Sequence, residues 1–174
     1  WVPEHPARNL REAIQSHFIC HIAAEIEQVG CGYSEAQLGR NLDPFFQRDK
    51  AAGLVNDEQA LFMMQNLFVK LNEVGYYFGE VVHLSNSADL AQSITMGGYT
   101  PEGDDGTVDM DYIIIDAQMY LKLPQPPLTC KYTPKMSSKF LEKVMDLIAT
   151  GTGMPQFING PLTVERALHL FSDT

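Results

Sequence analysis

Three short apolar runs in the second half of the chain constrain its fold more than any other feature. Each run is flanked by Gly or Pro, which is typical of a brief buried strand, and the runs lie at residues 94–96, 128–132 and 156–158. Apolar residues at helical spacing follow each run, at residues 108–121, 137–150 and 163–171. This alternation predicts parallel βα units. Three strands are too few to close a barrel, and a three-stranded parallel sheet leaves an edge unpaired. We therefore expect these residues to be a portion of a larger α/β fold.

The first half of the sequence is predicted to be helical. Apolar residues four apart predict one long helix from about residue 10 to Gly30, and Pro and Gly positions predict two further helices, at 44–52 and from about 57 to Gly75. A chain of 174 residues is long enough for one compact domain and too short for two ordinary ones. Residues 1–174 are therefore expected to form a single partial domain.

Charge and composition exclude several classes of partner. The chain has 22 acidic and 12 basic residues and a net charge of −10, and such a surface repels nucleic acid and anionic lipid. No apolar run approaches the roughly 18 residues that would span a bilayer, and the start lacks the features of a signal peptide, so a cytoplasmic location is expected. Three cysteines without a Cys-x-x-Cys pair predict reduced thiols.

One helical segment has the spacing of a metal site. His17, Cys20 and His21 stand at i, i+3 and i+4, which places two imidazoles and a thiolate on one helix face, where they could hold zinc. Apolar residues surround all three and no fourth ligand is indicated nearby. A helix packed within the fold is therefore the favoured interpretation.

The densest acidic group has two interpretations as well. It consists of Asp104, Asp105, Asp109 and Asp111. The group lacks the residue order of a calcium-binding loop. Because a helix is expected to begin near Thr107, interaction of these carboxylates with its positive end is favoured over a metal site.

Glycine-rich segments offer only weak motifs. The turn at 97–103 follows a strand, as a phosphate-binding loop does, but it lacks the Lys-Ser/Thr of a Walker motif and the order of a dinucleotide fingerprint. No nucleophile elbow or Ser-His-Asp spacing is present. Generic motifs therefore assign no activity.

Seven sequence blocks, taken in order, resemble the glycyl radical enzymes of the pyruvate formate-lyase-like group. They include the Leu-Gly-Arg-Asn-Leu-Asp-Pro-Phe-Phe block and the Gly-Gly-Tyr-Thr-Pro-Glu-Gly block, and they lie at residues 8–15, 38–50, 68–73, 97–107, 111–117, 124–129 and 151–157. Any one block is weak, but the ordered set covers nearly the whole chain.

This resemblance implies a fold and a reaction class. The family's fold is a ten-stranded α/β barrel surrounded by helices, so this chain would be a helix-rich N-terminal half followed by βα units from the first half of the barrel. In the family, a glycyl radical near the C-terminus generates a thiyl radical on a cysteine inside the barrel. The parent would be a lyase of the decarboxylase, dehydratase, formate-lyase or fumarate-adding type. The resemblance also implies a homodimeric parent whose radical is installed by a radical-SAM activating enzyme.

The family's radical motifs are not present in these residues. Neither the Gly-Cys-x-Glu loop nor the Arg-Val-x-Gly motif occurs, and Cys20, Cys31 and Cys130 lie in other contexts. We therefore expect a piece of a longer protein that is inactive alone and holds no cofactor itself. The alternative is a non-catalytic acidic helical binding protein derived from the same scaffold.

By resemblance, the chain contributes to the pocket of a small organic substrate. Tyr33 and Ser34 match a segment that gives relatives a polar contact, which suits a carboxylate or hydroxyl. A position at the start of the first strand maps to Ile94, with Ser93 as the alternative. Asn86 and Ser87 are further candidates. The structural alternatives are an ordinary core residue at Ile94, ordinary loop residues at 33–34 and helix caps at 86–87.

Overall fold

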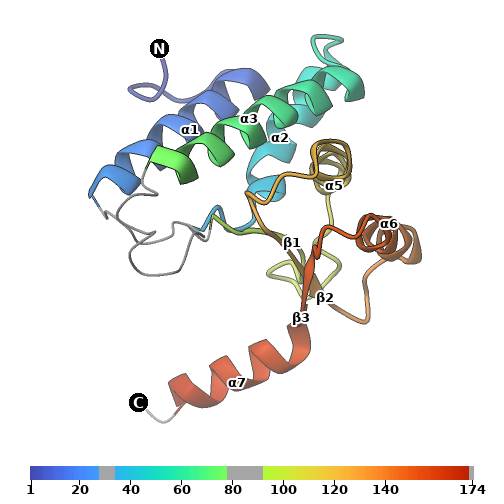
Figure 1. The fold of residues 1–174 in the computed structure, drawn as a ribbon. Coiled ribbons are helices and arrows are strands. Elements are labelled where there is room, and N and C mark those ends of the chain that lie inside the picture. The colour runs from blue at the N-terminus through green and yellow to red at the C-terminus, as the bar shows by residue number, and fades with distance from the viewer. Residues whose placement is uncertain (28–33, 78–91, 173–174) are drawn as a thin grey trace.

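A computed structural model describes residues 1–27, 34–77 and 92–172 (Figure 1). The described elements, in chain order, are α1 (Leu10–Glu27), α2 (Leu38–Ala51), α3 (Asp57–Tyr77), β1 (Ile94–Gly97), α5 (Asp109–Leu121), β2 (Leu128–Tyr132), α6 (Ser138–Ala149), β3 (Gln156–Asn159) and α7 (Gly160–Ser172). In the part of the chain that these elements cover, no helix has the length and apolar character needed to cross a membrane.

The first three helices form a packed layer, in which α1 and α3 run side by side in Figure 1. Its interior contains Phe46 and Phe68, both fully buried, and burial of such rings is the largest apolar contribution available to a side chain. The buried Asp49 carboxylate of α2 accepts a hydrogen bond of 2.6 Å from the backbone N–H of Leu10, the first residue of α1. This bond satisfies one of the free N–H groups at the start of α1 and joins the two helices.

The expected start of the second helix is wrong. The helix begins at Leu38, not at Pro44, which lies inside it. Leu38 and Leu42 are almost fully buried, and packing of their side chains extends the helix beyond the limit that Pro44 suggests. The third helix likewise continues past Gly75 to Tyr77.

The three strands form one parallel sheet in the order β1-β2-β3, so the predicted parallel βα units are confirmed. Ile94 of β1 pairs with Leu128 of β2, and Met96 pairs with Cys130. These four side chains are fully buried in the same core cluster as Phe140 of α6. One face of the sheet is therefore covered by the helices that follow the strands.

The last helix differs from the rest. In Figure 1, α7 runs away from the remainder of the molecule, and it packs mainly against β3. Leu168 and Leu170 on this helix are 67% and 74% exposed. Burial in the described residues thus decreases toward the last strand and helix.

Candidate functional site

The two faces of the sheet differ in chemistry. The face opposite the helices carries alternate strand residues that are mostly polar, and we call it the polar face; its residues are Ser93, Thr95, Thr129, Lys131 and Gln156. The hydroxyls of Ser93 and Thr129 lie 3.0 Å apart. A hollow of about 410 Å³ lies at the amino ends of the strands and is lined by Ser93, Thr129, Gln156 and neighbouring residues. This is where the sheet offers hydrogen-bonding groups to a small molecule.

Ser34 lies beside this face, next to Ser93. Its hydroxyl donates a hydrogen bond of 2.9 Å to the backbone carbonyl of Ser93 and accepts one from the N–H of Ala36. Ala36 in turn pairs with β1, because its carbonyl accepts the N–H of Thr95. The structure thus brings together two segments that are far apart in the sequence. Of the other candidates, Tyr33, Asn86 and Ser87 lie outside the described residues.

Ile94 lies on the opposite, core-facing side of β1. It is fully buried and belongs to the hydrophobic core cluster. Its pocket role stays a prediction, and its burial favours the ordinary-core interpretation. The alternation of side chains along a strand places its neighbour Ser93, the other possible match, on the polar face.

Glu35, the residue after Ser34, connects the segment at residues 34–36 to α1. His17 Nε2 contacts one oxygen of the fully buried Glu35 carboxylate, and His21 Nδ1 lies 2.7 Å from the other. Burial by itself raises the pKa of Glu35, but the two imidazoles outweigh burial and lower it. The spacing did place His17 and His21 on one helix face, where both meet Glu35. Over residues 1–27, 34–77 and 92–172, no group of three or more His, Cys, Asp or Glu side chains is arranged to hold a metal.

Arg40 organises the glycine-rich turn that follows β1. Its guanidinium donates hydrogen bonds of 2.8–2.9 Å to the backbone carbonyls of Gly97, Tyr99 and Gly106. A Cβ on Gly106 would lie 1.4 Å from Arg40 Nη2, so only glycine allows this approach. The turn therefore surrounds an arginine of the same chain. Sequence reasoning missed this role, although Arg40 belongs to one of the seven matching blocks.

Asp111 connects the same turn to α5. Its carboxylate accepts hydrogen bonds from the N–H groups of Val108 and Gly97, at 3.2 and 3.4 Å. Burial raises the pKa of Asp111 to about 7, because the charged form loses its hydration. The interpretation that these carboxylates interact with the start of a helix is supported at Asp111. The helix does begin near Thr107, but Thr107 is not its cap. Val108 holds the cap position, and the Thr107 hydroxyl donates to Asp105 instead.

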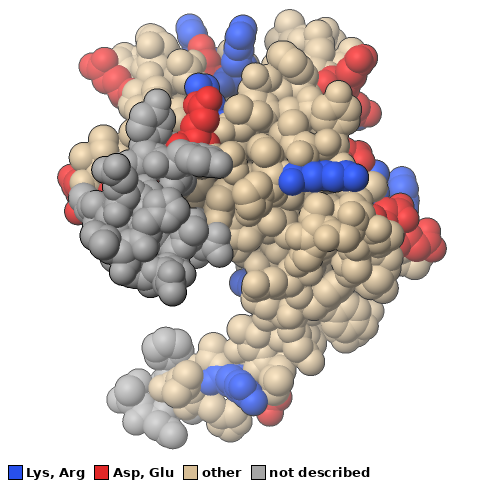
Figure 2. Space-filling view, in the orientation of Figure 1, with Lys and Arg blue, Asp and Glu red and all other residues tan. Residues whose placement is uncertain are grey.

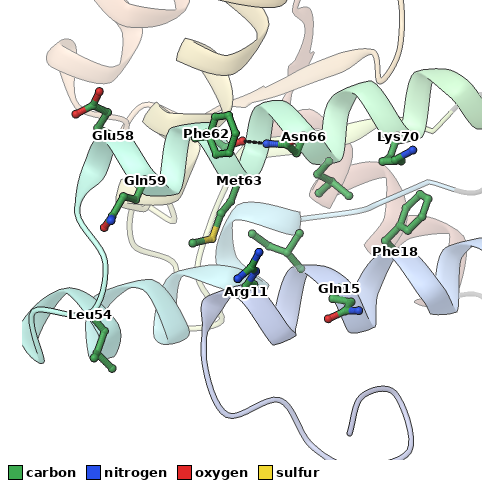
Figure 3. A pocket seen from close by; sticks show the side chains of 12 residues that line it. Arg11, Gln15, Phe18, Leu54, Glu58, Gln59, Phe62, Met63, Asn66 and Lys70 are labelled. Carbon is green, nitrogen blue, oxygen red and sulfur yellow. Dashed lines mark hydrogen bonds between the residues drawn. The ribbon is translucent and has the colours of Figure 1, made fainter.

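Most charged side chains on the face that Figure 2 shows lie along its upper and right-hand edges, and one blue side chain crosses its otherwise uncharged middle. A second and larger hollow, of about 1020 Å³, lies between α1 and α3 (Figure 3). Phe18, Phe62 and Met63 line it, together with the cationic side chains of Arg11 and Lys70. None of its lining residues comes from a strand, so it is separate from the polar face.

A parallel sheet whose strands alternate with helices is the arrangement of α/β proteins. Comparison with known proteins identifies its family: a model described as "Pyruvate formate lyase-like" matches residues 1–170. The chain belongs to this family, the pyruvate formate-lyase-like glycyl radical enzymes.

Curated relatives share the match over most of this chain. The isethionate sulfite-lyase of Nitratidesulfovibrio vulgaris is 30% identical over 91% of this chain and 20% of its own length. The trans-4-hydroxy-L-proline dehydratase of Clostridioides difficile is 30% identical over 96% of this chain and 22% of its own length. The chain thus spans about a fifth of the length of these relatives, which are glycyl radical lyases.

Solved structures agree with this assignment. A structure describing 1,2-propanediol dehydration in Roseburia inulinivorans has a TM-score of 0.86 at 26% identity, over 97% of this chain and 21% of its own. The hydroxyproline dehydratase from Clostridioides difficile has a TM-score of 0.80 at 28% identity, over 91% and 20%. The expected fold, a portion of a glycyl radical enzyme barrel with a helix-rich first half, is confirmed.

Proposed function

We propose that residues 1–174 form part of the barrel wall and substrate pocket of a longer glycyl radical lyase. The observation that carries this proposal is the difference between the two faces of the sheet. One face packs in the hydrophobic core, whereas the polar face lies outside that core and carries the hydroxyls expected of a pocket wall. The family match and the one-fifth coverage of the relatives support it. The parent is a cytoplasmic homodimer of the dehydratase, decarboxylase, formate-lyase, fumarate-adding or sulfite-lyase type.

The segment's own contribution is to bind and enclose a small organic substrate. Ser34 and Ser93 stand together at the polar face, and Tyr33, Asn86, Ser87 and Ile94 are the further predicted contributors. Hydrogen-atom transfer requires near contact between the reacting atoms, and a radical requires exclusion of water and oxygen. A rigid wall of paired strands serves both needs.

Other parts of the full-length protein supply the radical chemistry under this proposal. The 174 residues contain neither the Gly-Cys-x-Glu loop nor the Arg-Val-x-Gly motif. A glycyl radical installed by a radical-SAM activating enzyme provides the reactive centre.

The first test reads the parent gene downstream of the codon for Thr174. The proposal predicts a Gly-Cys-x-Glu sequence and a terminal glycine motif, and an electron paramagnetic resonance doublet of a glycyl radical after anaerobic activation. A stop codon directly after Thr174 would instead support the non-catalytic binding protein.

The second test addresses the pocket. In the activated full-length enzyme, Ser34→Ala should raise KM or lower kcat, because the hydroxyl orders the segment beside the polar face. Ser138→Ala, an exposed residue of α6, is the matched control. Equal, negligible effects of the two substitutions would contradict the pocket assignment.

A further inference from the structure

The polar face carries one cationic side chain, Lys131 of β2. The parallel register aligns Lys131 with Gly97 of β1 and Ile158 of β3, which places it on the same face as Thr129 and nearer the carboxyl ends of the strands. Its ammonium makes no ion pair or side-chain hydrogen bond within residues 1–27, 34–77 and 92–172, whereas Lys135 and Lys143 pair with carboxylates.

Gly98 gives the Lys131 side chain a defined place. A Cβ on Gly98 would lie 3.5 Å from Lys131 Cβ and 3.6 Å from Lys131 Cδ, so the aliphatic stem lies against the glycine backbone. Gly98 has a φ of +84°, a conformation that disfavours other residues. The stem is thus ordered by packing, and the ammonium continues beyond it.

Gln37 directs a second donor to the same place. Its Oε1 accepts a hydrogen bond of 2.8 Å from Arg40 Nη1, which fixes the orientation of the amide. Its Nε2 lies 3.7 Å from the same point above Gly98 and meets no acceptor in the described parts of the chain. The Lys131 stem and the Gln37 amide therefore lie around the same point over a glycine, and each side chain carries a hydrogen-bond donor.

The neighbouring carboxylates do not serve these donors. Asp111 is occupied by Val108 and Gly97 and lies against Gly39, and Asp104 pairs with Lys135. The chain as a whole carries a net charge of −10, so a cation on the polar face that has no carboxylate partner among the described residues is a local exception. In parallel α/β sheets, ligands bind at the carboxyl ends of the strands, which is where Lys131 and Gly98 lie.

We propose that Lys131 and Gln37 form a subsite for the carboxylate of a small organic substrate. The ammonium and the Nε2 amide donate to its oxygens, and Gly98 adds no side chain of its own between them. The inference rests on the proposed function for the identity of the ligand as a substrate. The hydroxyls of Ser93 and Thr129, at the amino ends of the strands, would then bind the remaining polar groups of a hydroxy acid.

The test measures binding without catalysis. The full-length protein, purified anaerobically and left unactivated, is titrated calorimetrically with lactate and with propane-1,2-diol, which differ in carrying a carboxylate or a neutral hydroxymethyl group. Charge-assisted hydrogen bonds predict that lactate binds roughly 10- to 100-fold more tightly. Lys131→Met, which keeps the stem over Gly98, should abolish this preference, and Lys131→Arg should retain most of it.

Two further variants separate local from general effects. Gln37→Glu keeps an acceptor for Arg40 but replaces the amide donor with a negative charge, so it should also abolish the preference. Lys139 lies on α6, over the Tyr112 ring. Lys139→Met also removes one positive charge, but it should leave the preference for lactate unchanged. Thermal unfolding without ligand checks each fold; if Lys131→Met fails to fold, Gln37→Glu and Lys131→Arg decide the question.

Several results would overturn the subsite. They are equal affinity for the two ligands, no measurable binding of lactate, or an unchanged preference in the folded Lys131→Met and Gln37→Glu variants. A carboxylate preference in a protein that forms no glycyl radical would contradict the proposed function and leave the subsite standing. A protein that forms a glycyl radical but shows no preference for the carboxylate ligand would support the proposed function and contradict the subsite.

Discussion

The helical layer and the β3–α7 region bury their apolar residues to very different degrees. In the layer of α1, α2 and α3, Phe46 and Phe68 are completely buried. In the last strand and helix, Phe157 is 43% exposed and Leu168 is 67% exposed. The layer therefore buries its apolar side chains in the core that it shares with α5 and the sheet, whereas the last βα unit presents apolar side chains that only a further packing partner would cover. The proposed barrel provides such a partner.

The largest expected effect comes from opening the core of the layer. Phe68→Ala should lower the free energy of unfolding by about 3–5 kcal/mol, because it removes buried apolar surface and leaves a cavity. Phe62→Ala, on the same helix but 66% exposed, should cost less than about 1 kcal/mol. Urea denaturation followed by circular dichroism measures both. Similar losses would show that the layer does not depend on this core.

The pH dependence should distinguish Asp111 from Glu35. Since the pKa of Asp111 is raised to about 7, the unfolded chain releases its proton at lower pH than the folded protein. The Asp111 contribution to the free energy of unfolding should therefore fall as pH rises from about 4 to about 7, by up to about 1.4 kcal/mol per pH unit. Asp111→Asn should flatten this slope in denaturation curves. An unchanged slope would contradict the assignment.

Glu35 should act in the opposite direction. Because its folded pKa is lowered, its contribution is present above the pKa of the unfolded chain and is lost as pH falls through the folded value. Glu35→Gln should therefore reduce the loss of stability at acidic pH and leave the slope due to Asp111 intact. The two variants can be compared in the same pH series.

A smaller effect is expected where the helical layer meets the turn after β1. Gly106→Ala should cost about 3 kcal/mol, because the new Cβ displaces the Arg40 guanidinium from the carbonyls that it binds. Gly103→Ala is the matched control in the same turn, since its Cβ meets nothing within 4 Å and only the left-handed backbone, at about 1–2 kcal/mol, opposes it. If the control costs more, Arg40 does not organise the turn.

The smallest effect tests the exposed region in two contexts. Leu168→Ala should change the free energy of unfolding of the 174-residue chain by less than about 0.5 kcal/mol, because the side chain is mostly exposed. In the full-length protein the same substitution should cost about 2 kcal/mol or more if α7 packs against the barrel. Equal small effects in both proteins would show that α7 stays uncovered.

Local sequence signals predicted the elements well where a periodic pattern and a stop signal coincide. The strand at 128–132 has its expected bounds, since Pro residues precede it and a turn follows. The start of α2 was not predicted, because burial of Leu38 depends on helices elsewhere in the chain. The site shows the same division: Ser34 was suggested by the resemblance of residues 33–34 to a segment of relatives, whereas the roles of Arg40, Glu35 and Lys131 depend on contacts between distant segments.

The sequence by itself determined the alternation of strands and helices, the helical first half and the family, because spacing, turn residues and ordered blocks are properties of neighbouring positions. Tertiary structure alone decided which strand residues turn away from the core. It placed Ser93 on the polar face and Ile94 in the core, and it brought Gln37 and Lys131 together over Gly98. A shift of one residue along a strand reverses the face of every side chain, and only pairing with the neighbouring strand and helices fixes that register.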